Sequence, residues 1–141
     1  MRKTANAEWS GGLKDGTGFI STETGALKRH PYGFKARFEE GPGTNPEELI
    51  GAAHAGCFTM ALSGQLAEAG MTATRLTTKA TVSLEKSDGG FSITAVHLEL
   101  EAEIPGVDQQ AFEQAAQRAK EGCPVSKLLN AKITLDAKLR A

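Results

Sequence analysis

The stretch from Asn45 to Gly70, NPEELIGAAHAGCFTMALSGQLAEAG, constrains the fold more than any other part of this chain. Asn45 can cap a helix and Pro46 suits its first position, while two glutamates follow in the first turn, near the positive end of the helix dipole. Gly70 suits the position just after a helix end. We therefore predict a helix that runs from this start to about Ala69.

Apolar side chains lie around most of the circumference of this predicted helix, among them Leu49, Ile50, Phe58, Met60 and Leu66. A helix that is apolar nearly all round must be covered on more than one side. The remainder of a 141-residue chain offers only one sheet and one other long helix as cover. We therefore predict a homodimer in which this helix lies in a central layer.

Strand patterns lie on both sides of the helix. A two-residue alternation predicts strands in GTGFISTET and in YGFKARFEE, where Phe34, Ala36 and Phe38 share one face and Arg37 lies on the other. Glycine-rich breaks between these segments indicate a meander.

After the helix, the alternation predicts strands in TRLTTKATVSLEK and FSITAVHLELEAEI, joined by a turn at SDGG. The apolar phase of the second strand shifts near Ala95-Val96, which indicates a bulge or burial on both faces. We expect Asp108 to cap a second helix that ends at Gly122, and Pro124 to open a short third one. AKITLDAKLR closes the chain as a strand. The predicted fold is a single α+β domain, residues 1–141.

Charge and hydropathy exclude several classes of function. The net charge is −1 with both signs interspersed, so no basic surface for nucleic acid or an anionic membrane is expected. The start, MRKTANAEWS, lacks the apolar stretch of a secretory signal. No apolar run approaches the roughly 20 residues that span a bilayer. We expect a cytoplasmic protein whose thiols are kept reduced.

The two cysteines, Cys57 and Cys123, lie too far apart for a CxxC motif and are too few for a cysteine-based zinc site. They are either two buried thiols or one reactive pair that the fold brings together, and composition alone favours the buried thiols. The three histidines show no ligand spacing, and no phosphate loop or dinucleotide fingerprint is present. We expect no metal site and no cofactor.

The local position of each thiol gives a first ranking of reactivity. Cys123 precedes Pro124 at the start of the short predicted helix, and helix starts stabilise thiolates, so position alone favours Cys123 as the more reactive thiol. Cys57 lies in mid-helix and needs a cation from elsewhere. Arg37 is the first candidate, and Lys35, Arg29 and Lys28 are weaker ones. The residues alone favour the alternative that Arg37 is a solvated residue on the polar face of its strand.

Two other side chains bear on this site. His54 lies three residues before Cys57, which makes them neighbours on the helix, but we interpret His54 as a packed, hydrogen-bonded core or interface residue and not as a catalytic base. Glu47 lies about ten residues from Cys57, which is about 15 Å along a helix. If both act in one site, Glu47 comes from a partner chain or acts through a relay, which favours an interfacial site.

The segments GTNPEELIGAAHAGCFTMALS and EGCPVSKLL resemble the OsmC/Ohr family of small thiol peroxidases, and most of all its OsmC branch. The resemblance implies an intertwined α+β homodimer, with two long central helices sandwiched by sheets from both chains. It makes Cys57 the peroxidatic cysteine and Cys123 the resolving one, which reverses the ranking from local position. Arg37 then activates the Cys57 thiolate, and Glu47, or its neighbour Glu48, bonds to that arginine.

The resemblance also implies the reaction. It predicts a peroxidase, free of metal and haem, that reduces organic hydroperoxides better than hydrogen peroxide, in oxidative or osmotic stress defence. Cys57 would form a sulfenic acid and then a disulfide with Cys123, which an external dithiol, such as a lipoylated protein, would reduce. We expect Phe38, Met60 and Phe91 to line an apolar pocket for the alkyl group. The alternatives are a thiol redox sensor and a non-catalytic ligand-binding dimer.

Overall fold

The computed structural model describes residues 1–140, which form two compact units, Met1–Leu49 and the segment from Ile50 onward. Both units combine helices with antiparallel or mixed sheets, so the predicted α+β class is confirmed. Within residues 1–140, no helix combines the length and the apolar composition that a bilayer-spanning helix needs.

The first unit contains a three-stranded antiparallel meander in the order β1-β2-β3, followed by a short helix. Glycines make the turns possible: Gly11 and Gly25 have φ angles of 98° and 81°, which other residues rarely adopt. The Trp9 and Tyr32 rings meet edge to face, with centroids 5.6 Å apart. The elements are β1 (Ala5–Ser10), β2 (Thr17–Thr22), β3 (His30–Tyr32) and α1 (Phe34–Phe38).

Within the segment YGFKARFEE, residues Phe34–Phe38 form the short helix α1 and not the predicted strand. The Arg37 N–H donates to the Gly33 carbonyl at 3.1 Å, as helical backbone does. Phe34 and Phe38 share a face in either conformation, because positions i and i+4 coincide in both periods. Their ring centroids lie 5.1 Å apart. The alternation predicted a strand, but this ring contact formed in a helix.

The long helix α2 spans Pro46–Glu68 and begins and ends as predicted, to within one residue. Its cap is Asn45, whose Oδ1 accepts from the Glu48 N–H at 2.7 Å. Gly70 follows the helix with a φ of 75°. In the second unit, α2 buries a stripe of residues four apart, namely His54, Phe58, Leu62 and Leu66.

The sheet of the second unit has the order β4-β5-β6, with β4 and β5 antiparallel and β6 parallel to β5. The register shifts where Ser83 pairs with Ala95 and Leu84 pairs with Ile93, so the bulge lies one residue from its predicted place. The Asp108 carboxylate caps α3, accepting from the Ala111 N–H at 2.9 Å. The elements are β4 (Arg75–Ser87), β5 (Gly90–Glu103), α3 (Gln109–Gly122), α4 (Pro124–Leu128) and β6 (Lys132–Arg140).

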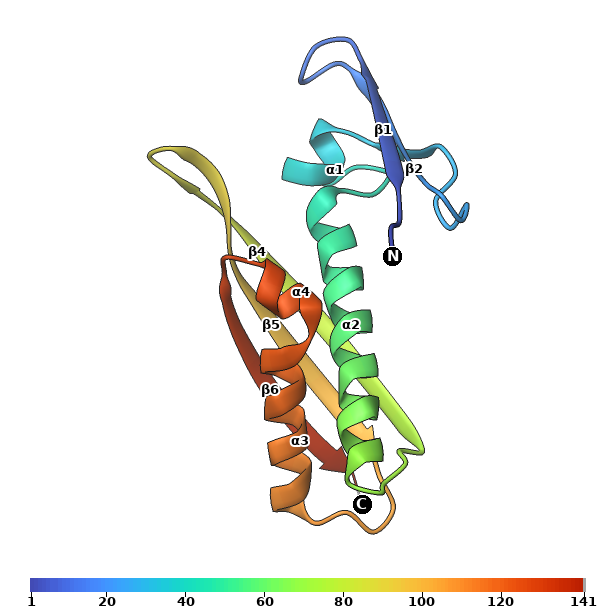
Figure 1. Ribbon diagram of the computed structural model, residues 1–141. Coiled ribbons are helices and arrows are strands. Elements are labelled where there is room, and N and C mark those ends of the chain that lie inside the picture. The colour runs from blue at the N-terminus through green and yellow to red at the C-terminus, as the bar shows by residue number, and fades with distance from the viewer. Residues whose placement is uncertain (141) are drawn as a thin grey trace. The chain divides into compact units, whose positions relative to one another are not determined.

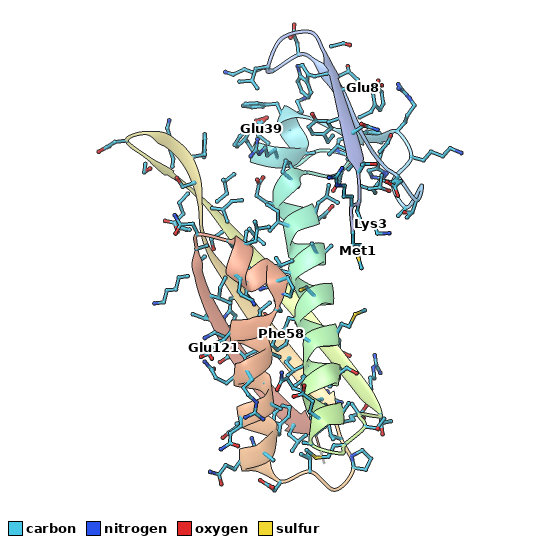
Figure 2. All side chains as sticks on the ribbon, in the orientation of Figure 1. Met1, Lys3, Glu8, Glu39, Phe58 and Glu121 are labelled. Carbon is cyan, nitrogen blue, oxygen red and sulfur yellow. The ribbon has the colours of Figure 1, made fainter. Side chains whose placement is uncertain are left out.

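Helices α2 and α3 lie side by side on one face of this sheet (Figure 1). The Arg118 Nε of α3 donates to the Gln65 Oε1 of α2 at 3.0 Å. Phe58 projects from α2 into the layer between helices and sheet (Figure 2), where it is fully buried. The core lies in this layer and includes Phe58, Leu62, Leu66, Val96, Leu98, Leu100, Phe112 and Cys123.

Candidate functional site

The two thiols meet at the junction of α2 with α4. Cys57 is half-buried in the middle of α2, and Cys123 is the buried N-cap residue of α4. The two thiols lie close enough to interact electrostatically, and the backbone N–H of Val125 lies near the Cys57 sulfur. Both are free thiols. The fold therefore brings the two cysteines together, and of the two readings left open by composition it favours a paired arrangement.

The surroundings of Cys57 hold it as a thiol. Burial raises the pKa of the Cys57 thiol above its ordinary value, the Val125 N–H works in the opposite direction, and Cys123 raises the pKa further. Since the thiolate is the nucleophilic form, these contacts leave Cys57 less reactive than a free cysteine at neutral pH. Activation requires a positive charge that none of these contacts supplies.

A line of hydrogen bonds continues from Cys123 into the core. The Ser126 N–H donates to the Cys123 sulfur at 3.3 Å, and the Ser126 hydroxyl lies 3.2 Å from the same sulfur. That hydroxyl also lies 2.7 Å from Nε2 of His54. His54 is fully buried, as the interpretation of a packed, hydrogen-bonded residue requires.

Ser126 is the residue that the sequence analysis did not single out. It occupies the third position of α4 after the capping Cys123, a spacing from which side chains often reach back to the cap. The spacing in CPVS was thus a usable signal for the Ser126–Cys123 contact, whereas nothing local connected Ser126 to His54.

Arg37 and Glu47 form a bidentate ion pair within the first unit. Arg37 Nε donates to Oε1 and Nη2 donates to Oε2, both at 3.0 Å. The Glu47 side chain is buried, and this planar fork-to-fork geometry is the strong form of the contact. The neighbouring Glu48 instead accepts from the Thr44 hydroxyl at 2.6 Å. Of the two adjacent acids, Glu47 is the one bonded to the arginine.

The three residues expected to bind the alkyl group lie on different elements. Phe38 ends α1, where the Arg37 guanidinium lies 5.3 Å from its ring centroid. Phe91 lies near the start of β5 and is 53% exposed. Met60 is 78% exposed on α2 and borders an open, mainly apolar groove against β4. Their role in substrate binding stays a prediction.

Comparison with known proteins gives consistent matches. The family model described as OsmC-like protein matches residues 39–138. Over 141 residues the chain is 54% identical to peroxiredoxin OsmC of Escherichia coli (strain K12). The aligned region covers 100% of this chain and 99% of the relative.

Two solved structures extend the comparison to the fold. The organic hydroperoxide resistance protein OhrB of Bacillus subtilis superposes with a TM-score of 0.69 at 28% identity, over 97% of this chain and 98% of that one. An OsmC-like protein of unknown function from Vibrio cholerae superposes with a TM-score of 0.78 at 18% identity, over 97% and 99%, which shows a shared fold alone.

Proposed function

Because the chain belongs to the OsmC-like protein family and is a thiol-dependent peroxidase, we propose that Cys57 and Cys123 are its peroxidatic and resolving cysteines. The observation that carries this proposal is the proximity of the two thiols, which come from separate helices and interact electrostatically. A resolving thiol must reach the oxidised sulfur, and these two thiols already lie close to each other.

The proposed cycle has three steps. The Cys57 thiolate attacks the distal oxygen of a hydroperoxide, the O–O bond breaks, and the alcohol leaves after taking up a proton. The resulting sulfenic acid on Cys57 condenses with Cys123, which gives an intrachain disulfide and one water. An external dithiol then reduces the disulfide by exchange. This cycle suits a reducing compartment, and we place it in the cytoplasm.

Arg37 is the proposed activator of Cys57, and Glu47 fixes its orientation. A guanidinium beside a thiol lowers its pKa, which offsets the effect of burial on Cys57. The bidentate bond to the buried Glu47 holds Arg37 in one geometry. Since Glu47 and Cys57 are about 15 Å apart along one helix, we propose that Arg37 acts on the Cys57 of a second copy of the chain.

Organic hydroperoxides are the proposed preferred substrates, with hydrogen peroxide as a weaker one. Two relatives carry names that refer to organic hydroperoxide resistance, the OhrB protein and its counterpart from Xanthomonas axonopodis. An apolar lining of Phe38, Met60 and Phe91 would bind the alkyl group. We propose a dithiol of the lipoyl type as the reductant, and a defensive role in oxidative or osmotic stress.

Steady-state turnover tests the proposal and separates it from the alternatives. Cumene hydroperoxide and hydrogen peroxide are each supplied in excess with dihydrolipoamide as reductant. We expect many equivalents of cumene hydroperoxide to be consumed, at a higher kcat/KM than hydrogen peroxide. Consumption that stops at one equivalent per chain would indicate a redox sensor. No consumption, with both thiols still titratable, would indicate a ligand-binding dimer.

Cys123→Ser is expected to permit one oxidation and then stop. The Cys57 thiolate can still attack the peroxide, but the sulfenic acid has no thiol with which to condense, and excess peroxide drives it to the sulfinic acid. We expect one equivalent of cumyl alcohol per chain in the first turnover, followed by a loss of steady-state turnover. Mass spectrometry of the intact chain checks the oxidation state. Undiminished turnover with dihydrolipoamide would remove Cys123 from the cycle.

A homodimer is proposed as the active form, with residues 1–141 of each copy as one catalytic domain. The face of α2 opposite its buried stripe exposes small and apolar residues, which agrees with the expectation that this helix needs cover on a second side. These residues are Ala52, Ala53, Gly56, Met60 and Ala67. Light scattering at micromolar concentration is expected to give twice the chain mass, and a monomer would contradict the proposal.

A further inference from the structure

We propose that Ser126 and His54 form a proton relay that activates Cys123 for its attack on the oxidised Cys57. This inference rests on the proposed thiol cycle and assigns a task to two residues outside it. The Ser126 hydroxyl touches both the Cys123 sulfur, at 3.2 Å, and Nε2 of His54, at 2.7 Å. Ser126 is then a catalytic residue, and His54 acts through it by taking up the proton that Ser126 passes on. This role goes beyond the interpretation of His54 as a packed residue.

The burial of His54 argues for a functional role. Its side chain is fully buried, and within residues 1–140 its Nδ1 atom has no hydrogen-bond partner. Leaving a buried polar atom unpaired costs about 1–3 kcal/mol, so an apolar residue would pack here at lower cost. Nε2 of His54 instead hydrogen-bonds to the Ser126 hydroxyl, which contacts the sulfur of the proposed resolving cysteine, Cys123.

The proton state of His54 fits a base. Burial lowers the pKa of His54 below its ordinary value, so the ring is neutral at neutral pH and can accept a proton. The polar groups near the His54–Ser126–Cys123 chain are the Cys57 thiol of α2, and the Cys123 thiol and Val125 N–H at the start of α4. Within residues 1–140, no ion pair involves His54.

The step balances as a condensation. The Cys123 thiol passes its proton to the Ser126 oxygen while the Ser126 hydroxyl passes its own to Nε2 of His54. The sulfur electron pair released on Cys123 forms the S–S bond to Cys57, and the S–O bond of the sulfenic acid breaks. The departing hydroxide leaves as water once His54 returns the proton through Ser126. One thiol and one sulfenic acid become one disulfide and one water.

Rapid-quench mass spectrometry tests the relay, since it separates thiol, sulfenic acid and disulfide after one equivalent of cumene hydroperoxide. In Ser126→Ala and His54→Gln we expect sulfenic acid to form at the wild-type rate and disulfide formation to slow by about 100-fold, the low end for general-base catalysis. Ser126→Ala keeps the backbone N–H bond to Cys123, and Ser126→Thr restores the hydroxyl and should restore the rate. His97→Gln is the matched control, because His97 bonds to Thr134 and Asp136 on β6 instead.

The pH profile separates a relay from a packing role. Neutral His54 is the base, so the wild-type condensation rate should rise through the lowered pKa of His54 and level off above it. In His54→Gln the condensation rate should keep rising with pH, so the difference in rate from the wild type should become smaller at high pH. A parallel drop at every pH, or wild-type condensation in Ser126→Ala, would overturn the relay. A wild-type chain that forms no sulfenic acid would instead overturn the proposed function.

Discussion

Cys57→Ser is expected to abolish the consumption of cumene hydroperoxide, with a fall in kcat/KM on the order of a thousandfold or more, the scale on which loss of a catalytic nucleophile acts. A serine hydroxyl is not ionised at neutral pH and does not form a sulfenic acid, so neither the first step nor the disulfide can follow. The measurement is multiple turnover with dihydrolipoamide, beside single-turnover release of the alcohol.

The structure offers a control that distinguishes lost chemistry from lost folding. Serine is close in size to cysteine, and Cys57 is only half-buried, so circular dichroism and the urea midpoint should stay near the wild-type values. Cys123→Ser should still give its single turnover under the same conditions. Multiple turnover by Cys57→Ser would mean that Cys123 is the attacking thiol, as its position at a helix start alone suggests.

Local signals predicted most of the fold because they act through the backbone next to them. Asn45 caps α2 and Gly70 follows its end, and both do so whatever surrounds the helix. The prediction of a strand in place of α1 was wrong because it, too, rested on a local pattern alone. Phe34 and Phe38 fit a strand face and a helix face equally well, and five residues are too few to separate a period of two from one of 3.6. The structure distinguishes the two conformations through the helical hydrogen bond from the Arg37 N–H to the Gly33 carbonyl and through the contact between the two rings.

The site could be predicted only in part, because its contacts join distant segments. The ranking of the thiols by helix position placed Cys123 first, but it could not include the contact between Cys57 and Cys123 or the burial that raises the pKa of Cys57. The sequence around His54 did not indicate its hydrogen-bond partner, because Ser126 lies on another helix. The family motifs, not periodicity, supplied the roles proposed for the two cysteines.

The choice between Glu47 and Glu48 shows the same limit. Two adjacent acids in a first helical turn have equal claims to an arginine on sequence grounds, and both suit the helix dipole. The structure separates them, because the Thr44 hydroxyl donates to Glu48, while Arg37 makes a bidentate ion pair with Glu47. Adjacent residues on a helix point about 100° apart, which is enough to send the two carboxylates to different partners.

Arg37→Ala is expected to slow the oxidation of Cys57 by between about tenfold and a thousandfold at neutral pH, since an opposite charge beside an ionisable group shifts its pKa by about 1–3 units. Without the guanidinium the pKa of Cys57 rises, so the rate should recover at higher pH. The midpoint of the rate–pH profile should therefore move upward. Arg140→Ala is the matched control, because it removes an arginine from a different, half-exposed pair with Glu101.

Mixed dimers test whether Arg37 acts on the second copy. A dimer that joins one Arg37→Ala chain to one Cys57→Ser chain, purified through two different affinity tags, holds one intact thiol and one intact arginine on opposite chains. If the arginine acts across the dimer, the intact Cys57 meets it, and we expect about half the wild-type rate with the wild-type pH midpoint. If it acts within its own chain, the mixed dimer stays as slow as Arg37→Ala. An unshifted pH profile in Arg37→Ala itself would remove this arginine from activation altogether.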